Sequence, residues 1–249
     1  MSRTRQMLGV GCWVLSVGAI FFAPSEAQEA RYEPRAAALL RDVGRATLAV
    51  KSLQAKVIVS RGLGSKRERV TGPVRLQRPN YVSVVMRGKL GQTVASDGAV
   101  VWVHNAATNQ FVKRKPAGTA KDIARTFGPL IPLALFFDST ILTTKTPQGT
   151  RVRLESPVTR NGIRYDVLAL IAPGIEIRLF VSPERVVHRS ITTSTRGKEP
   201  ASIDTELTGV RLNVPIPRTA FSYKPPKTAR ELPGPITVEV GPPSGKPKR

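Results

Sequence analysis

Few residues of this 249-residue chain are of types that carry out acid–base or metal chemistry. Its two histidines, His104 and His188, lie far apart in the sequence, each near or within a segment expected to form a strand. No HxxxH or HxH pair and no cluster of carboxylates accompanies them, so no metal site is predicted. The only cysteine, Cys12, lies in the apolar N-terminal segment, and the rest of the chain therefore has no thiol nucleophile and no thiolate ligand.

The acidic residues do not suggest an enzyme either. They are spread thinly, and no close pair in a loop is typical of a glycosidase or protease. The chain has no G-x-S-x-G, Walker loop or G-x-G-x-x-G motif. We predict a non-enzymatic protein with no catalytic residue and no cofactor. An exported hydrolase stays open as a third hypothesis, and it would require His104 or His188 to converge with acidic groups in the fold.

The first 27 residues form a separate export unit. Arg3 and Arg5 precede an apolar run at residues 7–23, and a small-x-small site ends at Ala27. This order is that of a secretory signal peptide cleaved after Ala27, and an uncleaved inner-membrane anchor formed by residues 7–23 is the alternative. In either case the remainder leaves the cytoplasm. We expect a periplasmic domain without disulfides, held together by its core alone.

The chain is strongly basic, with a formal net charge of +22. Removing residues 1–27 would take away two arginines and one glutamate and leave +21. Such an excess favours anionic partners, among them an anionic membrane surface, and export makes nucleic acid the least expected of these. The basic residues are scattered except at 113–115, so a merely soluble basic surface and a specific anionic partner both stay open.

Hydrophobic periodicity predicts one amphipathic helix followed by an antiparallel sheet. Apolar residues recur with helical spacing from Arg35 to Ser52, and from Leu53 the period changes to two, as in strands with one buried face. Residues 28–226 are read as one domain, and residues 227–249, rich in proline and glycine, as a tail without fixed structure. The predicted strands cover residues 53–61, 69–77, 80–88, 92–96, 100–104, 110–114, 151–155, 164–171, 175–181, 186–194 and 202–212.

The segment from Ala120 to Phe137 interrupts the sheet pattern. Residues 123–127 fit a short helix that ends at Gly128-Pro129, and Pro132 fits the first turn of a second helix. Leu130–Phe137 contains six large apolar side chains in eight residues. We interpret this segment as a lid or cavity wall in preference to ordinary core.

The candidate binding residues are therefore apolar. A curved sheet with helices on it either fills its concave side as a dry core or leaves a cavity for a hydrophobic guest. Core-lining and cavity-lining strands have the same pattern, so plain core packing stays an alternative for the hairpin aromatics. The predicted cavity and lid residues are Trp102, Phe111, Leu133, Phe136 and Phe137.

Several short motifs follow one another in a recognisable order. "AVKSLQAKVIVS" ends the helix, "RPNYV" opens a strand, "SDGAVVWVHN" forms a hairpin, a hydrophobic helical piece follows, and "FSYKPP" closes the domain. From Arg35 to Pro226 this order resembles the LolA-like superfamily of periplasmic lipoprotein carriers and lipoprotein-sorting-like proteins. In the characterised carriers a basic or polar residue near the mouth helps to govern retention and release, and no arginine of this sequence is matched to it.

The resemblance implies a mainly β fold: an open, incomplete antiparallel β-barrel with an N-terminal helix and a mid-chain helical lid on its concave face. It also implies that lipid or lipoprotein acyl chains occupy the concave space, with Trp102 and Phe111 in the hairpin unit and the other three candidates in the lid. We predict an exported binding protein for such a chain. The alternative is an envelope structural or sensing protein that uses the same scaffold to contact a protein and holds no lipid.

Overall fold

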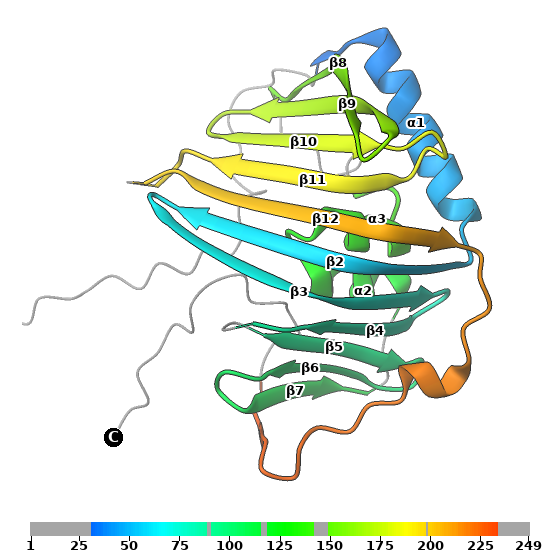
Figure 1. Cartoon of the computed structure of the whole chain (residues 1–249), viewed down its shortest axis with the longest axis vertical. Helices are drawn as coiled ribbons and strands as arrows, with labels where there is room; N and C mark the ends of the chain where they lie inside the picture. The colour runs from blue at the N-terminus through cyan, green and yellow to red at the C-terminus, as the bar shows by residue number, and fades with distance from the viewer. Residues whose placement is uncertain (1–30, 89–90, 116–118, 142–148, 198, 234–249) are drawn as a thin grey trace, which may run out of the picture.

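The protein folds around one strongly curved sheet (Figure 1). The computed structural model describes residues 31–88, 91–115, 119–141, 149–197 and 199–233, so the predicted signal peptide lies outside the described residues. The elements are β1 (Arg31–Tyr32), α1 (Pro34–Ala49), β2 (Ser52–Leu63), β3 (Lys66–Gln77), β4 (Tyr81–Met86), β5 (Gln92–Asp97), β6 (Val101–Asn105), β7 (Gln110–Arg114), α2 (Ala120–Phe127), α3 (Ile131–Phe137), β8 (Arg151–Arg160), β9 (Ile163–Ala172), β10 (Ile175–Val181), β11 (Val187–Ser194), β12 (Ala201–Leu212), a 3-10 helix (Arg218–Phe221) and β13 (Arg230–Glu231).

The strand order is β1-β8-β9-β10-β11-β12-β2-β3-β4-β5-β6-β7-β13. Neighbouring strands are antiparallel hairpin partners, except that β12 returns to pair with β2 and the two-residue strands β1 and β13 pair in parallel with β8 and β7. The three longest strands, β12, β2 and β3, therefore lie together in the middle. Because the two ends of the sheet do not pair with each other, the predicted open, incomplete barrel is confirmed.

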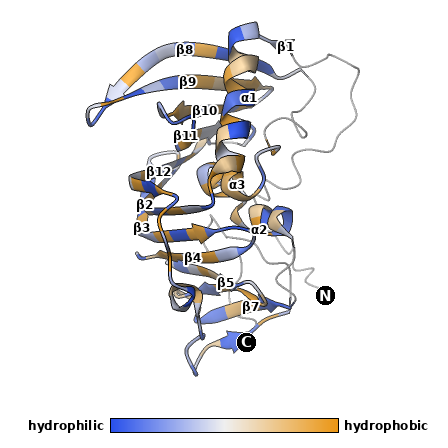
Figure 2. Ribbon diagram, turned by 90° about the vertical axis from the view of Figure 1, so that its right-hand side faces the viewer, coloured by the Kyte–Doolittle hydropathy of each residue, from blue (hydrophilic) through white to orange (hydrophobic). Residues whose placement is uncertain are grey.

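The three α-helices of the described residues lie on the concave side of the sheet (Figure 2). Helix α1 begins with Pro34 at its first turn, where a missing N–H costs no hydrogen bond. Its buried stripe includes Leu39, Leu40 and Val43 and faces the strands β8 to β11. The predicted amphipathic helix is thus confirmed.

The core has two parts that meet at α3. One cluster joins alternate residues of β2 to β6 to α2, and the other joins α1 to β8, β9, β10 and β11. Leu133 and Phe136 of α3 belong to the first cluster, whereas Ile131 and Leu135 belong to the second. Since each face of α3 touches a different part of the core, this short helix links the two halves of the concave side.

The segment after β12 packs on the convex side of β4 to β7. The ring of Phe221 lies 5.5 Å from that of Tyr81, and the Arg218 guanidinium lies 3.7 Å from the Tyr81 ring centroid. An unstructured tail was predicted from residue 227, but Arg230 and Glu231 form β13 along β7. Backbone hydrogen bonds to β7 and a 2.9 Å ion pair between Lys113 and Glu231 hold this piece, which corrects the prediction for residues 230–231.

Candidate functional site

The lid candidates Leu133, Phe136 and Phe137 come together in α3. The Phe136 and Phe137 rings meet edge to face at 4.9 Å, and Phe137 stacks on Phe127 of α2 at 6.1 Å. All seven residues of α3 are buried, with at most 8% of any side chain exposed. A helix that is apolar on every side belongs in the interior of a fold. The predicted helical segment is found; that it binds a ligand stays a prediction.

Directional contacts hold α2 more firmly than α3. Thr119 and Asp122 form a capping box at the start of α2, and the hydrogen bonds from Thr119 lower the pKa of Asp122. Helix α2 ends at Gly128, which has φ of +49° and open space where a Cβ would lie. Helix α3 begins three residues later without a side-chain cap at either end. Its position therefore depends mainly on apolar contacts.

Arg78, which sequence reasoning did not single out, ties this helix to α1. It lies in the turn between β3 and β4, and its Nε and Nη2 donate to the backbone oxygens of Val50 (2.9 Å) and Thr47 (3.1 Å) at the end of α1. Its guanidinium lies 5.0 Å from the centroid of the Phe136 ring, a cation–π contact. Burial lowers the pKa of Arg78. The sequence signal for Arg78 is its place in "RPNYV", a motif that opens a predicted strand and does not by itself indicate a contact with α1.

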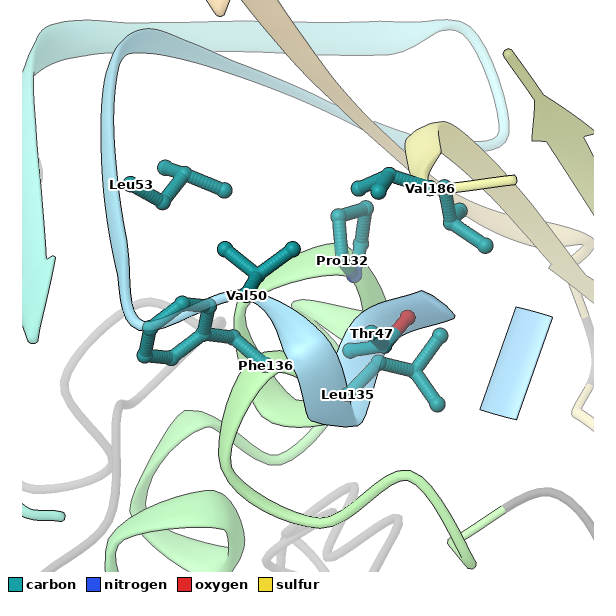
Figure 3. A pocket seen from close by; sticks show the side chains of 8 residues that line it. Thr47, Val50, Leu53, Pro132, Leu135, Phe136 and Val186 are labelled. Carbon is teal, nitrogen blue, oxygen red and sulfur yellow. The ribbon is translucent and has the colours of Figure 1, made fainter. Parts of the chain in front are cut away.

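The space beneath α3 is almost filled. A cavity of about 10 Å³ remains where α3 meets the end of α1 and the start of β2 (Figure 3). That is close to the smallest space that admits one water molecule. Of the two alternatives left open by the sequence, the described residues show a packed interior at this place. The lining residues are Thr47, Val50, Leu53, Pro132, Leu135, Phe136, Val186 and Val187.

Trp102 and Phe111 do not join the lid residues, which corrects their predicted place in the concave cavity. Val101 and Val103 of β6 point into the concave cluster, so Trp102 between them points to the convex face. There its ring lies 6.4 Å from that of Tyr223 in the C-terminal segment. Phe111 is the cross-strand partner of His104, whose ring also contacts Tyr223, and so shares that face.

The residues that an exported hydrolase would need are far apart. His104 lies on β6 and His188 on β11, six strand spacings away, or about 29 Å along the sheet. Burial lowers the pKa of His188 despite the nearby Glu184 carboxylate. Within the described ranges, no group of three or more His, Cys, Asp or Glu residues is arranged to hold a metal ion.

The fold and this site define the class of the protein: an open half-barrel whose concave face is covered by two amphipathic helices and the apolar helix α3. Residues 37–233 match the family described as "Predicted periplasmic protein (DUF2092)", and the chain belongs to this family. No curated protein matches the chain. Among the described residues, no helix combines the length and the apolar character needed to cross a membrane.

Solved structures with a similar fold include proteins of three bacteria. An uncharacterized conserved protein from Thermus thermophilus is 15% identical, with a TM-score of 0.48, over 80% of this chain and 98% of that one. A LolA superfamily protein from Nitrosomonas europaea is 12% identical, with a TM-score of 0.34, over 76% of this chain and 97% of that one. A chain of the MucA/MucB complex from Pseudomonas aeruginosa is 12% identical, with a TM-score of 0.45, over 76% of this chain and 61% of that one. The predicted resemblance to the LolA-like superfamily is confirmed as a resemblance.

Proposed function

We propose that this protein is a non-enzymatic binding protein of the cell envelope that holds a lipid or lipoprotein acyl chain on the concave face of its sheet. The chain would occupy the space that α3 fills here. The observation that carries this proposal is α3 itself: seven residues, all apolar and all buried, that join two otherwise separate parts of the core. Such a helix makes the same contacts with the sheet that an acyl chain would make.

The energies of the two occupants are comparable. Five large side chains of α3 are buried, and burial of each contributes about 1.5 to 3 kcal/mol, or about 8 to 15 kcal/mol in all. A chain of about 16 carbons contributes about 0.8 kcal/mol per methylene, or about 13 kcal/mol. An acyl chain can therefore replace α3 at little net cost. A catalytic residue is not needed for such an exchange.

The connections of α3 suit this exchange. Gly128 supplies a backbone position with positive φ next to open space, where the chain can change direction between α2 and α3. On the other side, Arg78 holds Phe136 by a contact that a moving helix would break. Helix α2, with its capping box, would remain in place while α3 leaves.

The test combines bound lipid with the exposure of α3. We expect native mass spectrometry of the full chain, purified from the bacterial envelope, to detect bound lipid. We expect palmitoyl lysophosphatidylglycerol, added to the delipidated protein, to speed amide hydrogen exchange in residues 131–137 and to leave α1 unchanged. If no lipid is retained or bound, the proposal is wrong. If lipid binds while the amides of α3 stay protected from exchange, the acyl chain does not occupy the space of α3 and that part of the proposal is wrong.

The packed interior also favours a second candidate, in which the scaffold contacts an envelope protein. Val158 and Ile163, near the tip of the β8–β9 hairpin, are 38% and 37% exposed. Within the described chain, β1 covers only the first residues of β8, and the outer edge after Glu155 has no strand partner. An unpaired edge can accept a strand from another protein. A photo-crosslinker at residue 158 would then capture one defined partner in intact envelopes, whereas one at residue 69, also exposed, would not.

A further inference from the structure

Three hydroxyl groups without a hydrogen-bond partner lie side by side on the concave face. Ser190 and Thr192 belong to β11 and Thr205 to the neighbouring β12, and their hydroxyl oxygens are buried and unpaired. Ser190 is the direct cross-strand partner of Thr205. Ser190 is 1% exposed and Thr205 is fully buried. We call these three residues the hydroxyl band.

Such a group of side chains is unusual in a core. Buried side-chain polar atoms nearly always have a hydrogen-bond partner, and valine has the shape of threonine without the unpaired hydroxyl. Helix α3, whose residues are all apolar, packs against β11 and β12. The band therefore weakens the core that it belongs to, and a role in binding oxygen atoms of a ligand accounts for its presence.

The band lies between an apolar floor and a partly buried cation. Two residues after Thr205 on β12, Leu207 points to the same concave face. Leu207 pairs with Val57 of β2, and Leu207 and Val57 both belong to the apolar cluster. Toward the turns that join β2 to β3 and β11 to β12, at the left of Figure 1, the next row contains Arg61. That row lies about 7 Å farther along the strands than Thr205. Arg61 is thus one row away from Thr205 on the concave face, and the apolar Val59 and Ile203 are the cross-strand partners of Thr205 and Arg61.

Arg61 has the character of an anion-binding residue rather than a surface charge. Its side chain is only 12% exposed, and Nη2 donates to the Glu68 carboxylate at 3.1 Å. Glu68 itself is 42% exposed and so is much better solvated than its partner. A guanidinium has five N–H donors in a planar fork, so Arg61 can bind a second anion without releasing Glu68. The net charge of +22 favours the approach of that anion.

We propose that the hydroxyl band and Arg61 bind the phosphate of an anionic lipid head group, while the lipid's acyl chain lies over Val57 and Leu207 in the space of α3. This inference rests on the proposed function, because the head group reaches the band only when the chain has replaced α3. It adds a selectivity that an apolar cavity alone would not have. A lipid with the same chain and no phosphate would bind more weakly.

The experiment compares three probes on the full chain by isothermal titration calorimetry: palmitoyl lysophosphatidylglycerol, monopalmitoylglycerol and inorganic phosphate. We expect the first to bind at least about tenfold more tightly than the second, as one or two hydrogen bonds to a charged group imply. We expect phosphate alone to show no binding, since it has no chain. The double variant Ser190→Ala/Thr205→Val should lose this preference, and Arg61→Gln should lose it in the same way. The affinity of the double variant for monopalmitoylglycerol should fall by no more than about tenfold, because loss of the unpaired hydroxyls stabilises the closed state that the lipid displaces.

A matched control exists on the other face of the same two strands. Thr193 and Ser202 form a cross-strand pair one position away from the band, and their side chains point to the convex side. The variant Thr193→Val/Ser202→Ala should keep the preference. If both lipids bind equally, or if the control variant loses the preference too, the head-group site is wrong while the acyl-chain proposal stands. If neither lipid binds, the proposed function is wrong and this inference falls with it.

Discussion

Truncating Leu133 in α3 has opposite expected effects on stability and on lipid affinity. Leu133 is fully buried in the larger cluster. Leu→Ala at such a site costs about 2 to 5 kcal/mol of the free energy of unfolding. If α3 leaves the sheet when the acyl chain binds, the lipid-bound state does not lose those contacts. The same substitution then penalises only the closed state, against which the lipid competes.

The size of the effect follows from this competition. A closed state weakened by about 3 kcal/mol would tighten the apparent affinity for palmitoyl lysophosphatidylglycerol by up to about 100-fold. The matched control is Leu207→Ala on β12, which removes the same atoms from the floor beneath α3. That variant should lose similar stability but leave the lipid affinity nearly unchanged, since the floor touches α3 in the closed state and the guest in the bound state. Stability is measured by urea denaturation and affinity by calorimetry.

One result would refute the reasoning. If Leu133→Ala binds the lipid no more tightly than Leu207→Ala does, α3 is not displaced, and an affinity below that of the wild type would make α3 part of the wall of the site. A milder change keeps the test usable if Leu133→Ala does not fold. Ile131→Val in the same helix costs only about 0.5 to 1.5 kcal/mol and should tighten binding about two- to tenfold.

Three other predictions concern stability. Thr205→Val should raise the free energy of unfolding by about 1 kcal/mol, because it removes an unpaired buried hydroxyl at constant shape; a lower melting temperature by calorimetry would contradict this. Arg78→Gln should lower the free energy of unfolding by about 2 kcal/mol, because the hydrogen bonds to α1 and the contact with Phe136 are lost. Arg78→Lys should not restore this free energy, as urea denaturation would show. Asp122→Asn should lower the melting temperature at pH 7. Because hydrogen bonds from Thr119 lower the folded pKa of Asp122, its contribution is present above the unfolded pKa of about 3.9 and is lost as pH falls through the folded value, so the variant and the wild type should converge in acid.

The sequence was sufficient for the elements and for the type of sheet. Apolar spacing of two predicted the strands because each has one face against the helices, as at Val82 and Val84 of β4. Pro132 and the seven apolar residues around it predicted a second short helix, and α3 begins one residue before that proline. These features are local, and local sequence determines them directly.

The candidate site was harder to predict because alternation does not say which face is concave. Trp102 and Phe111 were assigned to the cavity by residue type, but both lie on the convex face, where the C-terminal segment gives Trp102 a partner in Tyr223. That contact joins residues about 120 positions apart and leaves no periodic signal. Arg78 and the hydroxyl band were missed for the same reason, since their neighbours come from other strands and helices.

A filled interior does not by itself separate a core from a closed binding site, but polar groups within it do. A core selected only for stability would place valine at residue 205, whereas a site that opens keeps groups that serve the open state. The same distinction applies to the contacts of α3, which are apolar apart from the Arg78 cation over Phe136. Apolar contacts are non-directional, so a flexible acyl chain can replace them without matching a particular geometry. The unpaired hydroxyls on the two strands that α3 packs against are therefore the feature that favours a closed site over a permanent core.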